Sequence, residues 1–158
     1  MSSLTELLRD PAVEQFARSR ALEKKENASA LLIAGLACTM SAPRGQLYGR
    51  AGRKCHLEDG ERYLERAIRI SGEHPVLVAA LCLNYNMQRR GKEALAESYM
   101  GQARADTYWD ELCNDSIDLE MEEELGALKK KLEEMEHRGS DLVPTIQSFK
   151  DWLFCSMV

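Results

Sequence analysis

The most regular pattern of apolar and polar positions lies in residues 77–104, where two helical patterns flank a glycine. Gly91 stands between them, and glycine ends a helix at little cost because it adopts the left-handed conformation. Small alanines in the second pattern would let the two backbones approach closely. The spacing therefore predicts an antiparallel hairpin of two helices. Its packing positions are Leu77, Ala80, Leu81 and Met87 on the first helix, and Ala94, Leu95, Met100 and Ala103 on the second.

A second hairpin is predicted over residues 28–70. Asn27 can cap a helix that runs from Ala28 to Met40. Another helix is predicted at about 57–70, with one apolar face formed by Leu64, Ala67 and Ile70. Residues 41–56 between the two helices exceed what a hairpin turn needs, so we expect a mobile surface insertion there.

The two ends of the chain are also predicted to be helical. Residues 1–26 read as two short helices, and residues 115–138 as a long acidic helix that Gly139 ends. The long helix has heptad-type spacing, which indicates either an intramolecular packing face or a coiled coil: Met121, Leu125, Leu128, Leu132 and Met135. A last helix at 144–157 carries Ile146, Phe149, Leu153 and Met157 on one face, and Trp152, Phe154 and Cys155 extend its apolar surface. It must be covered, either by the protein's own helices or by a partner subunit.

These elements predict one all-α domain over residues 1–158, a right-handed array of helical hairpins with a C-terminal helical cap. Residues 1–26 would form the N-terminal helices, 27–105 two repeat-like hairpins with the 41–56 insertion, and 106–158 the acidic and apolar helices. Aromatic residues make up only 6% of the chain, and alternating strand patterns are absent, which disfavours a sheet.

The hairpin at 77–104 resembles a tetratricopeptide repeat. If Leu77 is the first position of the repeat, the family's characteristic positions fall on Leu83, Gly91, Ala96, Met100 and Ala103. A weaker copy is found upstream at Leu31, Ala34, Gly35 and Cys38. The resemblance implies a protein-binding scaffold, because such repeats bind proteins and peptides and rarely carry out chemistry.

The same resemblance implies a binding groove, since the first helix of each repeat lines a concave surface. The positions carried over are Leu32, Leu36 and Met40 in the first hairpin, and Val78, Leu81, Tyr85, Gln88 and Arg89 in the second. Most are apolar, which suits the apolar face of a partner's amphipathic helix. The alternative is that the chain's own last helix fills the groove.

Residues 80–98 are also loosely similar to the needle-subunit chaperones of bacterial type III secretion. That similarity implies a secretion chaperone that holds an aggregation-prone subunit. Another adaptor or scaffold fits the same pattern. A small enzyme or a nucleic-acid-binding protein on a helical scaffold is the alternative from a different class. The oligomeric state and the partner's identity stay open.

Candidate chemistry is sparse, so no catalytic residue, cofactor or metal is expected. Cys55 and His56 are adjacent but lack a second ligand pair at metal spacing. Gly45, Gly49 and Gly52 near Lys54 match neither a Walker loop nor a dinucleotide fingerprint. The net charge of −5 disfavours nucleic acid, although the basic residues of the 41–56 loop could meet an acidic partner.

The expected compartment is the cytoplasm. The N-terminus lacks the basic start and apolar core of a secretory signal, and no apolar run approaches the length of a membrane span. The five scattered cysteines are expected to be free thiols.

Overall fold

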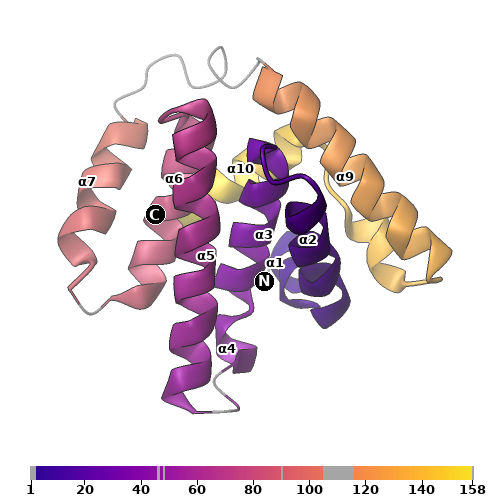
Figure 1. Cartoon of the computed structure of the whole chain (residues 1–158), viewed down its shortest axis with the longest axis horizontal. Helices are drawn as coiled ribbons and strands as arrows, with labels where there is room; N and C mark the ends of the chain where they lie inside the picture. Colours follow the sequence, from indigo (N-terminus) through magenta and orange to yellow (C-terminus); the bar gives the residue numbers. More distant parts are fainter. Residues whose placement is uncertain (1–2, 46, 48, 90, 105–115, 158) are drawn as a thin grey trace.

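The computed structural model describes residues 3–45, 47, 49–89, 91–104 and 116–157, and every regular element in these ranges is a helix (Figure 1). The prediction of an all-α fold is confirmed. The elements are α1 Ser3–Arg9, α2 Pro11–Glu23, α3 Ala28–Met40, α4 Ala42–Gly45, α5 Arg50–Ser71, α6 Pro75–Gln88, α7 Glu93–Arg104, α9 Ser116–Glu134, the 3-10 helix η2 Arg138–Leu142 and α10 Ile146–Met157. No described helix is long and apolar enough to cross a membrane.

Helix α3 is the centre of the fold. All thirteen of its residues are buried, as expected for a helix whose sequence is almost entirely apolar. Its start follows from Asn27, whose side-chain oxygen accepts a hydrogen bond from the Ala30 amide at 2.9 Å. In Figure 1, α3 lies between α2 and α5, and α3 packs against both.

Helices α3 and α5 approach each other closely at two glycines. A Cβ atom on Gly35 would lie 2.7 Å from a Leu64 side-chain carbon, and one on Gly60 would lie 2.6 Å from the Thr39 hydroxyl. Because contacts move back along α5 as they move forward along α3, the two helices run antiparallel. The predicted hairpin over 28–70 is therefore confirmed.

The hairpin over 77–104 is also confirmed, as α6 and α7. Contacts move back along the second segment as they move forward along the first, so the two helices run antiparallel. Glu73 accepts from Gln102 at 2.8 Å, the Cys82 thiol donates to the Ala96 carbonyl at 3.2 Å, and the Lys92 ammonium lies 5.1 Å from the centre of the Tyr85 ring. Between the helices Gly91 has a φ of 77°, the left-handed conformation that its position predicts.

The last two helices close the core. Met121, Leu125, Leu128 and Leu132 of α9 are buried, so the heptad-type face packs within the molecule. Helix α10 packs along α6 and buries Phe149, Trp152 and Leu153. The Trp152 indole donates to the Thr5 hydroxyl of α1 at 2.9 Å. The chain's own helices therefore cover Phe149, Trp152 and Leu153 of the apolar last helix, whereas Phe154 and Cys155 stay exposed.

Three predicted boundaries were wrong. The 41–56 segment is mostly helical, because α4 lies within it and α5 begins at Arg50 instead of Leu57; no proline interrupts residues 50–57. Helix α9 ends at Glu134, and Glu136 has a φ of 54°, so the glycine at 139 does not end it. Met135 is consequently exposed. The last helix begins at Ile146, after Pro144.

Three residues named or counted in the sequence analysis are not fully described. Cys113, one of the five cysteines, and the side chains of Ala103 and Met157 lie outside the described residues.

The glycine contact between α3 and α5 gives a test of the packing. We expect Gly60→Ala to destabilise the protein by about 1–3 kcal/mol, because the added methyl group would meet Thr39, Asn84 and the Gly35 carbonyl. The matched control is Gly126→Ala in α9, where an added Cβ meets nothing within 4 Å. That change should stabilise the helix by about 0.5–1 kcal/mol. Chemical denaturation measures both, and equal effects would contradict the close approach.

A buried ion pair gives a second test. The Lys150 ammonium of α10 lies 2.6 Å from the Asp118 carboxylate of α9, and both residues are buried. We expect Lys150→Met to cost about 3–5 kcal/mol, since it leaves a buried carboxylate without its cation. The double variant Lys150→Met/Asp118→Leu should recover most of this loss. A single variant within about 1 kcal/mol of the wild type would contradict a stabilising role for the pair.

Candidate functional site

The eight residues predicted to bind a partner do not line an open groove among the described residues. Six of them are buried in the central core: Leu32, Leu36, Met40, Val78, Leu81 and Tyr85. Helices α2, α5 and α9 pack on α3, while α5, α7 and α10 pack on α6. In this arrangement a partner helix cannot reach these side chains, and their role in binding stays a prediction.

The two remaining positions lie at the end of α6. The half-buried Gln88 amide donates to Glu61 at 2.7 Å and to the Asn84 side-chain oxygen at 2.6 Å. Arg89 is exposed and follows the helix with a φ of 62°. Neither residue forms part of an apolar surface.

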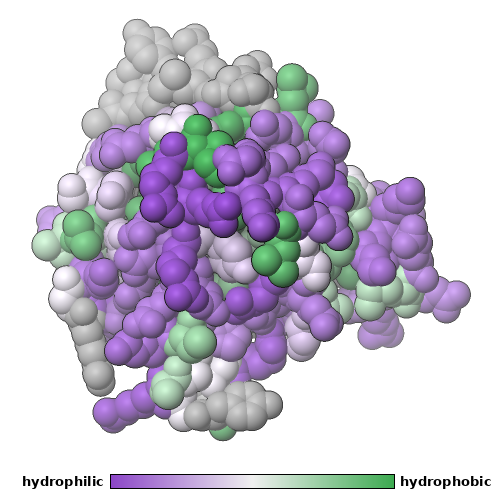
Figure 2. All heavy atoms as spheres, in the orientation of Figure 1, coloured by the Kyte–Doolittle hydropathy of each residue, from purple (hydrophilic) through white to green (hydrophobic). Residues whose placement is uncertain are grey.

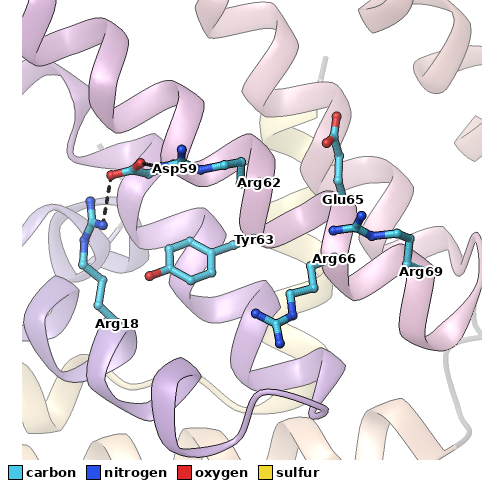
Figure 3. Close-up of a pocket in the computed structure, with 7 residues that line it drawn as sticks. All are labelled: Arg18, Asp59, Arg62, Tyr63, Glu65, Arg66 and Arg69. Carbon is cyan, nitrogen blue, oxygen red and sulfur yellow. Dashed lines mark hydrogen bonds and ion pairs between the residues drawn. The ribbon is translucent and has the colours of Figure 1, made fainter.

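A different concave site lies between α2 and α5. We call it the arginine pocket, and it has a volume of about 440 Å³. Figure 3 shows its lining residues, Arg18 of α2 and Asp59, Arg62, Tyr63, Glu65, Arg66 and Arg69 of α5. The face of the molecule in Figure 2 is largely hydrophilic, with apolar side chains confined to small separate patches.

Helix periodicity explains how α5 builds this site. Leu57, Gly60, Leu64 and Ala67 are buried, and the face they form packs on α3. Arg62, Arg66 and Arg69 recur at intervals of four and three residues, so a helix places them together on another face. The same packing that buries the apolar face of α5 thus presents three guanidinium groups outward.

One end of the arginine pocket is held by ion pairs. The Arg18 guanidinium donates to the Glu14 carboxylate at 2.9 Å and to the Asp59 carboxylate at 3.0 Å. Arg62 also pairs with Asp59 (Figure 3). The charge of Asp59 is therefore already balanced by two arginines.

The buried Glu14 carboxylate pairs with Arg18 and belongs to the same network of ion pairs. It is only 8% exposed, and burial by itself raises the pKa of its carboxyl. Hydrogen bonds from Arg18 and Arg44, together with the charges of Arg18 and His56, outweigh burial and leave the pKa below its usual value. Arg44 is thus engaged inside the protein, and Arg53 likewise donates to the Met87 carbonyl at 2.9 Å. Arg44 and Arg53 therefore already have partners within the protein, although the sequence suggested that the basic residues of 41–56 could meet an acidic partner.

The other end of the pocket is different, because Arg66 and Arg69 have no hydrogen bond or ion pair with any described residue. The hydroxyl of the half-buried Tyr63 is also unpartnered within the described ranges. In Figure 3 the Tyr63 ring lies between Arg18 and Arg66. Two guanidinium groups and a phenol hydroxyl in one pocket therefore have no hydrogen-bond partner among the residues that the structure describes.

Glu65 does not neutralise these arginines. Its carboxylate points away from Arg66 in Figure 3 and accepts a hydrogen bond from the Tyr85 hydroxyl at 3.4 Å. Burial, and then the hydrogen bond and charge of Glu61, raise the pKa of Glu65. The carboxylates of Glu61 and Glu65 belong to a polar network with Tyr85 and Lys92 on the α6 side of α5.

The described residues hold no cluster of three metal-ligating side chains. Four free cysteines are described. Cys38 and Cys82 are buried, and Cys55 and Cys155 are exposed. Burial raises the pKa of the Cys38 thiol to about 12, so it is protonated and a poor nucleophile at neutral pH. The arrangement supports binding of an anion better than it supports chemistry.

The arginine pocket is the feature that sequence reasoning missed. Attention to the apolar face of the 57–70 helix overlooked the polar face that carries Arg62, Arg66 and Arg69. Their spacing was visible in the sequence. The contribution of Arg18 from α2 could not be read there, because it depends on how α2 packs beside α5.

Comparison of the chain with protein-family models, curated proteins and solved structures finds no match.

The Glu14 network predicts a dependence of stability on pH. Because the folded-state pKa of Glu14 lies below its ordinary value of 4.5, its contribution is present above that pH and is lost as pH falls through the folded value. We expect Glu14→Gln to cost about 2 kcal/mol at pH 7. The gap to wild type should narrow as the pH falls below about 4.5. Urea denaturation across pH measures the gap. Glu122→Gln, at an exposed position, should show little effect at any pH, and a gap independent of pH would refute the role of Glu14.

Proposed function

We propose that the protein is a non-catalytic protein–protein interaction module that binds an acidic partner in the arginine pocket. The observation that carries this proposal is the pair Arg66 and Arg69, which line one concave site and lack a partner among the described residues. Unpaired arginines in a pocket suit a ligand that supplies negative charge, because a guanidinium forms strong, often bidentate, hydrogen bonds with carboxylate and phosphate groups.

The surroundings of the pocket favour a protein over a nucleic acid. The chain has a net charge of −5, and Glu58, Glu61 and Glu65 alternate with the arginines in the sequence of α5. A nucleic-acid backbone needs a longer basic track than these few arginines provide. A single acidic side chain has to contact only Arg66 and Arg69.

The resemblance to tetratricopeptide repeats, and more loosely to needle-subunit chaperones, supports protein binding as the class of function. A right-handed tetratricopeptide-type array and a role as a secretion chaperone are finer proposals of the same class. Binding of a partner's amphipathic helix along α6 would require α10 to leave. The proposal made here needs no such rearrangement, because the arginine pocket is open to solvent.

We expect a glutamate-rich peptide, labelled with a fluorophore, to bind the protein, and Arg66→Ala/Arg69→Ala to weaken this binding at least about tenfold. The matched control is Arg50→Ala/Lys54→Ala, which removes the same charge from exposed positions at the start of the same helix. It should change the affinity much less, because neither residue lines the pocket. Fluorescence anisotropy at about 0.15 M salt gives both affinities under physiological screening.

Equal losses in the two double variants would show attraction by net charge alone and would refute the pocket. Tighter, strongly salt-dependent binding of a single-stranded oligonucleotide than of the peptide would favour nucleic acid instead. Circular dichroism must show that both variants keep the helix content of the wild type.

A further inference from the structure

We infer that the acidic group recognised in the arginine pocket is a phosphate monoester, as carried by a phosphorylated side chain, in preference to a carboxylate. This inference rests on the proposed function and names its ligand class. It follows from the charge, the donor geometry and the size of the pocket, taken in turn.

The charge of the pocket matches a dianion. Asp59 is already balanced by Arg18 and Arg62, and Glu65 is turned toward Tyr85. Arg66 and Arg69 therefore carry two positive charges that no described residue pairs with. A carboxylate would neutralise one of them. A phosphate monoester carries a charge of about −1.5 to −2 at neutral pH and neutralises both.

The pocket also offers more hydrogen-bond donors than the two oxygens of a carboxylate can accept in good geometry. Arg66, Arg69 and the Tyr63 hydroxyl come from three positions spaced three residues apart along α5, 63, 66 and 69, and all three line the pocket. A tetrahedral phosphate offers three terminal oxygens pointing in different directions, whereas a carboxylate offers two in one plane. In Figure 3 the Tyr63 hydroxyl points toward Arg18, so the donors left for one ligand are the guanidinium groups of Arg66 and Arg69. Two forked donors match the three oxygens of a phosphate better than the two of a carboxylate.

The size of the pocket argues for an ester over a free ion. A volume of about 440 Å³ falls in the range of sites that take small molecules, about 300–1,000 Å³. Inorganic phosphate alone would leave most of this space to water. The Tyr63 ring, half-buried against the core, offers an apolar wall for the carbon atoms that carry the phosphate.

The local structure fixes the helix backbone that carries Arg66 and Arg69 and leaves their guanidinium groups unpaired among the described residues. The pairing of Arg18 and Arg62 on Asp59 fixes the α2 side of the pocket, and Glu14 holds Arg18 from below at 2.9 Å. Arg66 and Arg69 remain on the rigid helix α5 with their hydrogen-bond capacity unused by the described residues. Only the side-chain rotamers of the two arginines, and not the backbone that carries them, have to be ordered when the ligand arrives.

The experiment compares three versions of one short peptide, carrying phosphoserine, glutamate or serine at the same position, by isothermal titration calorimetry against the full chain. We expect the phosphoserine peptide to bind at least about tenfold tighter than the glutamate peptide, and the serine peptide to bind least. Arg66→Lys and Arg69→Lys, which keep the charge and lose the planar fork, should remove much of the preference for phosphate. Arg50→Lys is the matched control and should keep it.

Measuring the affinity of the peptides as a function of pH tests phosphate binding directly, because a purely structural role of the arginines would not make the affinity follow the pKa of the phosphate. The second pKa of a phosphate monoester is about 6, so binding of the phosphoserine peptide should weaken as pH falls from about 7.5 to about 5.5. Binding of the glutamate peptide should change much less over this range, because its carboxylate stays ionised.

The outcomes separate the two proposals. Equal affinity for the phosphoserine and glutamate peptides would overturn the phosphate inference and leave the acidic partner standing. Failure of both peptides would overturn both. Equal binding of free O-phosphoserine and of the phosphopeptide would support the phosphate monoester, and would identify a small molecule in place of a protein as its source.

Discussion

The close approach of α3 and α5 is the constraint on which the rest of the structure depends. Helix α3 is apolar on every side, so it is stable only where other helices surround it. Gly35 and Gly60 allow α5 to come near enough to bury it, and a side chain at either position would push the two helices apart. Asn84 of α6 joins the same contact, with its amide donating to Thr39 at 2.9 Å and to the Leu57 carbonyl at 3.0 Å. One small region therefore sets the relative positions of α3, α5 and α6.

The same constraint places the arginine pocket. Because Gly60, Leu64 and Ala67 must face α3, the rotation of α5 about its axis is fixed, and Arg66 and Arg69 are carried on a different face of the helix. The position of α2 is set by its own packing on α3, which brings Arg18 to Asp59. The pocket therefore follows from the packing of two helices on one central helix, and that packing fixes the backbone positions of its residues.

The sequence predicted this fold as far as local patterns determine it. The Asn27 cap and the glycine between α6 and α7 depend on neighbours in sequence, and both predictions were confirmed. The heptad-type face of α9 was confirmed for Met121, Leu125, Leu128 and Leu132 but not for Met135, which lies past the end of the helix. The predicted start of α5 was wrong because glycines and charged residues before Leu57 suggested a loop. In the structure, helix α5 includes Gly52 and begins at Arg50. The pocket was missed because tertiary packing brings Arg18 of α2 beside the arginines of α5, and no local sequence pattern encodes that packing.

The predicted groove was also decided by tertiary packing, which the local sequence pattern does not encode. Apolar residues on α3 and α6 predicted a surface for a helix, and a helix does lie against α6, but it is the chain's own α10. Lys150 and Asp118 explain why this arrangement excludes a simple exchange. A partner helix that displaced α10 would leave the Asp118 carboxylate without its ammonium unless it brought a cation to the same depth. It would also have to replace the bond from the Trp152 indole to Thr5. Apolar complementarity alone is therefore insufficient to open this face, whereas the proposed binding of an acidic group in the arginine pocket would break no contact in the core.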